Sequence, residues 1–153
     1  MSIFPLKHPP IVVSACLFGL SCRYDGAARP ASLSGRVTEL DPLLPACPEE
    51  LGGLPTPRPA CELWDGDGAA VLAGRARVLV RGGGEDRTEA FLRGARRLAD
   101  LARSCGSERA ILKARSPSCG VRSSWREGGL RPGPGVASAA LRAAGLRVEE
   151  IDA

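Results

Sequence analysis

Three cysteines stand at or just beyond the ends of short apolar runs, and their thiols could hold a metal cluster. Cys16 follows "IVVSA", Cys47 follows "PLLPA", and Cys119 lies in "SPSCG", soon after "AILKA". Cysteine thiolates are soft ligands that suit zinc and iron–sulfur clusters. The glycines, prolines and serines beside each cysteine would also place backbone N–H groups near the sulfurs. The alternative is that each thiol is a small buried hydrophobic group.

The other three of the six cysteines have different settings, and no C-x-x-C pair occurs, so zinc-ribbon spacing is absent. Cys22, in "SCRYDG", lies near Cys16 in the sequence. It could be a fourth ligand, a thiol that handles sulfur, or a packed bystander. Cys61 in a proline-rich turn and Cys105 after a helix are both expected to be structural.

An acid and two hydroxyls accompany the candidate ligands. Glu49 comes two residues after Cys47, where its carboxyl group could transfer protons to anything the thiol binds. A glutamate in the first turn of a helix, favoured by the helix dipole, is the simpler interpretation. Ser116 and Ser118 flank Pro117 just before Cys119. They could bind a small polar substrate or cap the next turn.

The segment "CPEELGGLPTPRPACE", which starts at Cys47, combines this thiol and acid with a constrained backbone. Its prolines restrict φ, while Gly52 and Gly53 permit tight turns. Such a loop has a small unfolded ensemble, so ordering it costs little. We therefore expect this segment to form a pre-organised site.

Strand patterns alternate with helix patterns along the chain. We expect strands over 11–15, 42–46, 110–114 and 146–151, and two short strands within 68–80 around Ala73-Gly74. A long helix should begin near Asp86 or Thr88, with Glu89 completing a capping box, and end at Gly106. Its apolar stripe runs through Phe91, Ala95, Leu98 and Ala102. A second helix is expected over 135–145.

This alternation predicts an α/β fold with a mostly parallel sheet and an added short β-hairpin. In such sheets ligands bind beyond the carboxyl ends of the strands. Because Cys16, Cys47 and Cys119 all lie at that edge, they can meet in space although they are far apart in the sequence.

Size and charge set limits on the class of protein. A chain of 153 residues fits a single domain, predicted to span 1–153, with one core. The net charge of +4 comes without a dense basic run, so nucleic-acid binding is not expected.

The N-terminal segment is broken by prolines and offers no signal peptide or membrane span. We expect a cytoplasmic protein whose cysteines are not structural disulfides. The oligomeric state is left open.

Five segments taken in order resemble the motifs of the domain-of-unknown-function family 523, which contains the TudS-like thiouracil desulfidases. They are "VSACLFGLSCRYDG", "CPEELGGLPTPRPACE", "GEDRTEAFLRGA", "AILKARSPSCG" and "GVASAALRAAGLRV". The resemblance covers about residues 11–150. It implies a compact Rossmann-like α/β domain.

The resemblance also implies an iron–sulfur enzyme. A [4Fe–4S] cluster would have three cysteine ligands, at Cys16, Cys47 and Cys119, and one open iron site. The family's catalytic acid falls on Glu49, and its active-site serine on Ser116. The implied reaction removes sulfur from a small thiolated molecule such as thiouracil and releases sulfide. A thiolate on the open iron would block this chemistry, so Cys22 should not be a permanent ligand.

The sequence departs from the family pattern after Cys119. Many members carry a "YDGTF"-like segment there, whereas this chain reads "VRSSWREGGL". We expect this difference to reshape the substrate pocket. Two other hypotheses remain at this stage: a non-enzymatic iron–sulfur or metal-binding module in sulfur or RNA metabolism, and a zinc- or thiol-based hydrolase.

Overall fold

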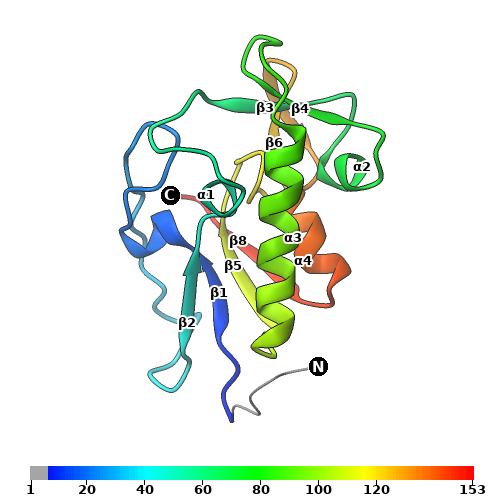
Figure 1. Ribbon diagram of the computed structural model, residues 1–153. Helices are drawn as coiled ribbons and strands as arrows, with labels where there is room; N and C mark the ends of the chain where they lie inside the picture. Colours follow the sequence, from blue (N-terminus) through cyan, green and yellow to red (C-terminus); the bar gives the residue numbers. More distant parts are fainter. Residues whose placement is uncertain (1–6) are drawn as a thin grey trace.

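The computed structural model describes residues 7–153 and contains two four-stranded sheets (Figure 1). The first six residues, part of the predicted domain and of the proline-broken N-terminal segment, lie outside this range. The predicted α/β class with a mostly parallel sheet is confirmed. No helix within residues 7–153 is long and apolar enough to cross a membrane.

The first sheet is wholly parallel, with strand order β2-β1-β5-β8. Its strands are β1 (Ile11–Ser14), β2 (Leu43–Ala46), β5 (Arg109–Lys113) and β8 (Arg147–Ile151). Side chains alternate between the two faces of a strand. Val12 therefore joins the core under the helices, while Ile11 and Val13 face a second cluster under the loop that contains Ala31 and Leu33.

The helices α3 (Thr88–Ser104) and α4 (Val136–Ala143) pack against each other and contribute to the main core (Figure 1). The predicted stripe is confirmed, because Phe91, Ala95, Leu98 and Ala102 are all buried. Asp86 accepts a 2.8 Å hydrogen bond from the backbone N–H of Thr88 at the start of α3. The chain leaves the helix through Gly106, whose φ of 71° is left-handed.

The second sheet has the order β4-β3-β6-β7 and lies at one end of the first (Figure 1). It consists of β3 (Cys61–Trp64), β4 (Arg77–Val80), β6 (Ser123–Arg126) and β7 (Gly129–Pro132). Both β3–β4 and β6–β7 are antiparallel, whereas β3 and β6 are parallel. The β6–β7 turn uses left-handed Glu127 and Gly128, with φ of 49° and 86°.

The prediction of two strands within 68–80 is wrong for its first half, which forms the helix α2 (Gly68–Leu72). The carboxylate of Asp67 caps this helix by accepting a 3.0 Å bond from the N–H of Ala70. Val71 then enters the core. A Cβ on Gly68 would lie 2.2 Å from the backbone of Gly135, so this glycine allows α2 to approach the start of α4.

Candidate active site

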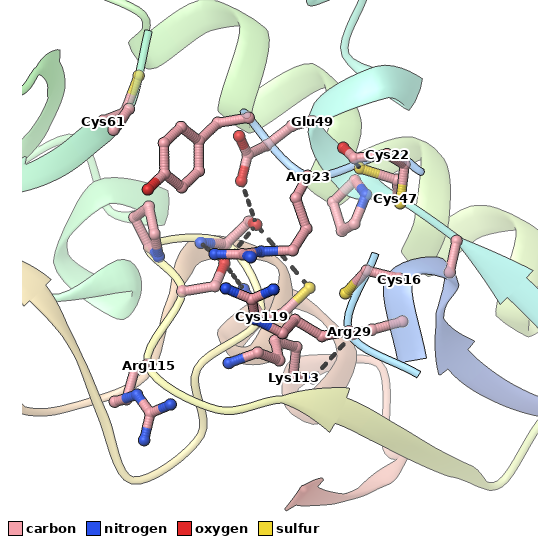
Figure 2. A pocket seen from close by; sticks show the side chains of 18 of the residues that line it. Cys16, Cys22, Arg23, Arg29, Cys47, Glu49, Cys61, Lys113, Arg115 and Cys119 are labelled. Atoms are coloured by element: carbon pink, nitrogen blue, oxygen red, sulfur yellow. Dashed lines mark hydrogen bonds between the residues drawn. The ribbon is translucent and has the colours of Figure 1, made fainter. Parts of the chain in front are cut away.

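A cavity of about 320 Å³ opens at the carboxyl edge of the first sheet, and five cysteines line it (Figure 2). The parallel pairing of the strands explains why three of these cysteines lie there. Ser14 at the end of β1 pairs with Ala46 at the end of β2, so the residues that follow both strands leave the same edge. Cys16 lies in the 3₁₀ helix η1 (Ala15–Phe18), and Cys47 is the N-cap of α1 (Pro48–Leu51).

Cys119 reaches the cavity from the loop that follows β5, as the sequence predicted. The structure thus brings Cys16, Cys47 and Cys119 to one cavity. The other two cysteines of the cavity are Cys22, from the loop after η1, and Cys61. All five thiols are free.

The thiol of Cys22 lies within hydrogen-bonding reach of the sulfurs of Cys16 and Cys47 and can donate its one hydrogen to either. These bonds raise the pKa of Cys22, because its proton is shared with two neighbours. The same bond lowers the pKa of Cys16 to about 7, with Lys113 and Arg23 adding positive charge nearby. The bond from Cys22 also lowers the pKa of Cys47, and burial opposes it. Two thiols are therefore poised to become thiolates, the form that binds metals.

The pKa values of Cys119 and Cys61 are raised rather than lowered. Burial raises the pKa of Cys119 to about 12, although Ser14 and Ser118 lower it in part. A bound metal deprotonates a coordinating thiol outright, so this shift is compatible with a ligand role. Burial also raises the pKa of Cys61 to about 11. Cys61 begins β3 rather than lying in a turn, and it lines the cavity apart from the other thiols (Figure 2).

Glu49 points into the cavity from the first turn of α1, and both of its carboxylate oxygens are engaged. Its Oε1 accepts a 2.9 Å bond from Nε of Arg58, and its Oε2 accepts a 2.8 Å bond from Oγ of Ser118. The dipole at the start of α1 also favours a negative charge there. The two interpretations of Glu49, a residue of the first helical turn and an acid beside the thiols, are therefore both compatible with its position.

Arg58 is a buried residue that the sequence analysis did not single out. Its side chain is 3% exposed and pairs with Glu49. It also donates to the backbone oxygen of Cys22 at 2.9 Å and lies 3.8 Å from the sulfur of Cys47. This arginine joins the constrained "PTPRP" loop to two cysteine-bearing loops. The run of prolines around it was the available signal, since such a rigid loop must hold something in place.

Ser116 and Ser118 lie beside Cys119 and hydrogen-bond to each other, with 2.9 Å between their Oγ atoms. Ser116 Oγ accepts from the backbone N–H groups of Ser118 at 3.1 Å and Cys119 at 3.0 Å. It therefore caps this turn, which was one of the two predicted roles. Ser118 is buried and reaches Glu49.

Cations gather on one side of the cavity. Lys113 at the end of β5 lines it together with Arg23 and Arg29 (Figure 2). Burial and the nearby Arg115 lower the pKa of Lys113. Positive charge beside the sulfurs would offset the negative charge of thiolate ligands.

Trp125 of β6, in the second sheet, and Arg81, which directly follows β4, also line the cavity. The guanidinium of Arg81 lies 5.5 Å from the centre of the Trp125 ring. Arg81 also donates a 3.1 Å bond to Glu62, a buried acid whose other oxygen accepts from the N–H of Gly128 at 2.7 Å. Trp125 belongs to the segment "VRSSWREGGL" and is its residue in the lining of the cavity; that the segment reshapes the substrate pocket stays a prediction.

The donor set fits an iron–sulfur cluster. Thiols from three loops surround a cavity, two of them with a lowered pKa, and cations stand beside them. Among residues 7–153, no group of three or more His, Cys, Asp and Glu side chains could hold a single metal ion. A cluster is larger than one ion and takes its thiolates at wider spacing.

Fold and cavity together define a class: an α/β protein with a thiol-lined site at the carboxyl edge of a parallel sheet. Residues 11–152 match the model of the 2-thiouracil desulfurase family, and the chain belongs to this family. The uncharacterised protein YbbK of Bacillus subtilis (strain 168) is 38% identical over 141 residues, which are 90% of this chain and 93% of YbbK.

A solved structure is similar as well. It is that of the [4Fe–4S]-dependent thiouracil desulfidase TudS, with 37% sequence identity and a TM-score of 0.73. The alignment covers 93% of this chain and 90% of the TudS chain. The predicted resemblance to TudS-like members of family 523 is thereby confirmed.

Proposed function

We propose that this protein is a [4Fe–4S]-dependent desulfidase that removes sulfur from a small thiolated substrate, a thiouracil-like nucleobase, and releases sulfide. One observation carries the proposal: three cysteines from separate strand ends line one cavity together with the carboxylate of Glu49. Membership of the family and the likeness to TudS support the same reaction.

The ligands we propose are Cys16, Cys47 and Cys119, which leave one iron without a protein ligand. When bound, such a cluster supplies a Lewis-acidic iron with affinity for sulfur. Cys22 serves Cys16 and Cys47 as a hydrogen-bond donor, a role supported by the proximity of its thiol to their sulfurs. Hydrogen bonds to ligand sulfurs tune a cluster's potential.

Protons must move when water replaces sulfur at the thiocarbonyl carbon, and we assign this work to Glu49. Arg58 holds the carboxylate in place. Ser116 is the residue that the family resemblance assigns to the substrate, and this role stays a prediction. Its observed contacts order the turn that carries Ser118 and Cys119.

We also propose a cytoplasmic location for the single domain. The six cysteines support it, since all are free thiols, as is usual where the environment is reducing.

The test is anaerobic reconstitution, analysis of iron and labile sulfide, and assay of sulfide release from a panel of thiolated bases and nucleosides. We expect a brown protein with about four irons per chain. The variants Cys16→Ala, Cys47→Ala and Cys119→Ala should each lose the iron. The variant Cys22→Ala and the control Cys105→Ala should keep it. Glu49→Gln should keep the iron and lose sulfide release.

If reconstitution gives a colourless protein that contains zinc, the proposal of an iron–sulfur cluster is wrong. A brown protein that releases no sulfide from any member of the panel would instead support a cluster-carrying module without desulfidase activity.

A further inference from the structure

Ser118 occupies a position between the acid and the cavity that the proposed function does not use. Its hydroxyl lies 2.8 Å from Oε2 of Glu49, 2.9 Å from Oγ of Ser116 and 3.8 Å from the sulfur of Cys119. The residue is 3% exposed, yet it lines the cavity.

The directions of these hydrogen bonds follow from counting hydrogens. A carboxylate paired with the guanidinium of Arg58 has no proton of its own and only accepts. Ser118 has a single hydroxyl hydrogen, and it donates this hydrogen to Glu49 at 2.8 Å rather than to the more distant sulfur of Cys119 at 3.8 Å. In the contact between the two serines, Ser116 is then the donor and Ser118 the acceptor.

This assignment leaves the two serines with different remaining capacity. A hydroxyl oxygen accepts through two lone pairs. Ser116 Oγ uses both of them for the backbone N–H groups of Ser118 and Cys119. Ser118 Oγ accepts from Ser116 alone among the described residues, so one lone pair remains for a molecule in the cavity.

We propose that Ser118 relays a proton between a water molecule in the cavity and Glu49; this inference rests on the proposed function. As the water oxygen bonds to the thiocarbonyl carbon, the C=S π bond opens and its electron pair moves to the sulfur, while a water O–H bond breaks and a new O–H bond forms on Ser118. The original O–H bond of Ser118 breaks at the same time, and the proton passes to Oε2 of Glu49. One proton moves from water to Glu49 and no electrons are exchanged.

Four variants distinguish a proton relay through Ser118 from a purely structural role of this residue. Ser118→Ala removes the hydroxyl, Ser118→Thr restores it, and Ser116→Ala removes the cap of the turn. Ser138→Ala is the matched control, because Ser138 is a buried serine of α4 whose hydroxyl has no partner among residues 7–153.

Ser118→Ala should bind iron as the wild type does and keep its KM, while kcat falls by about 10²-fold or more. Ser118→Thr should recover most of that loss. The proton inventory in mixtures of light and heavy water should be curved for the wild type, where two protons move together, and straight for Ser118→Ala. Ser116→Ala should mainly weaken iron retention, since two backbone N–H groups lose their acceptor.

A second measurement does not depend on turnover. In infrared spectra of the cluster-free protein, the carboxylate band of Glu49 can be identified by its loss in Glu49→Gln. It should shift in Ser118→Ala and stay in place in Ser118→Thr and Ser138→Ala.

Ser118→Ala with an unchanged kcat, or with a curved proton inventory like the wild type, would overturn the relay. If Ser118→Ala loses iron, and the molecules that keep iron are fully active, Ser118 has only a structural role. An unmoved Glu49 band would show that the hydrogen bond is absent. If the wild-type holoprotein releases no sulfide while the band shifts as expected, the proposed function and the relay fail, but the Ser118–Glu49 contact stands.

Discussion

At the scale of single residues, neighbours decide which thiols in the cavity become thiolates. Cys16 has the donor thiol of Cys22 and the charge of Lys113 beside it, and these lower its pKa to about 7. Cys61 faces the same cavity without a donor thiol beside it, and burial raises its pKa to about 11 although the charges of Arg87 and Arg58 oppose the shift. The cysteines of one cavity therefore differ in the protonation state that metals and electrophiles require.

We predict that alkylation of the cluster-free protein by iodoacetamide will distinguish these thiols. At pH 8, Cys16 is mostly thiolate and Cys61 mostly thiol, so Cys16 should react on the order of tenfold faster or more, after allowance for the weaker nucleophilicity of a low-pKa thiolate. The rate at Cys16 should rise through about pH 7 and then level off. Mass spectrometry of peptides after timed quenching measures both rates.

Cys22→Ala should slow the reaction of Cys16 at pH 7, because loss of the donor raises the pKa of Cys16. Cys105→Ala, outside the cavity, is the control and should leave the rate unchanged. Equal rates for Cys16 and Cys61 across this pH range would contradict the proposed pattern of hydrogen bonds.

The site residues that the sequence could place are those fixed by strand ends. Parallel strands share one carboxyl edge, so Cys16, Cys47 and Cys119 could be brought together from the pattern of apolar runs alone. Arg58 and Trp125 could not be placed in this way. Each reaches the cavity through the packing of a loop or of the second sheet, and no local periodicity encodes that packing.

At the scale of elements, α1 carries both Cys47 and Glu49, and its position depends on two glycines. A Cβ on Gly94 of α3 would lie 1.8 Å from the carbonyl oxygen of Pro48, and one on Gly52 would lie 2.0 Å from that of Ala90. The backbones of the two helices therefore touch. Arg93 and Arg97 of α3 add bonds to the carbonyls of Gly52 and Leu51 at the end of α1.

We predict that Gly94→Ala will destabilise the protein although alanine is the better helix former. Alanine in a helix interior gains up to about 1 kcal/mol over glycine. The clash is with backbone, which cannot rotate away, and such overpacking costs about 1–3 kcal/mol. The free energy of unfolding, measured with urea, should therefore fall, and iron retention should fall with it because α1 is displaced.

Arg96→Ala is the matched control, since Arg96 is an exposed residue of the same helix. Its free energy of unfolding should change by less than about 0.5 kcal/mol. A Gly94→Ala variant as stable as the wild type, with normal iron content, would show that α1 can shift without harm to the site.

Helices and strands could be predicted where the apolar residues follow one clear periodicity. They were missed where a capping residue or a turn determines the structure. The stripe of α3 and the buried strands β1 and β5 have strong periodicity. The run Gly68–Leu72 is apolar and resembles a strand, yet Asp67 caps it and it forms α2. The short strands β6 and β7 lack an apolar alternation, and their signal was the Glu127-Gly128 turn.

At the scale of the whole molecule, the two sheets share one hydrophobic core. The main cluster contains Val12 and Leu112 from the first sheet, Leu63 and Val78 from the second, and Leu98 from α3. The cavity is lined both by residues at the carboxyl edge of the first sheet, such as Cys16 and Cys47, and by Cys61 and Trp125 of the second sheet. A site built from both sheets requires that they keep their relative positions.

We predict that the chain unfolds as one cooperative unit, which also tests the predicted single domain. Both tryptophans, Trp64 in β3 and Trp125 in β6, report on the second sheet, while circular dichroism at 222 nm reports mainly on α3. In guanidinium chloride the two signals of the cluster-free protein should have the same midpoint. Leu63→Ala, in the core of the second sheet, should cost about 2–5 kcal/mol and lower both midpoints equally. A shift of the fluorescence midpoint alone would mean that the second sheet unfolds by itself, in which case a shared cavity could not hold its geometry without the cluster.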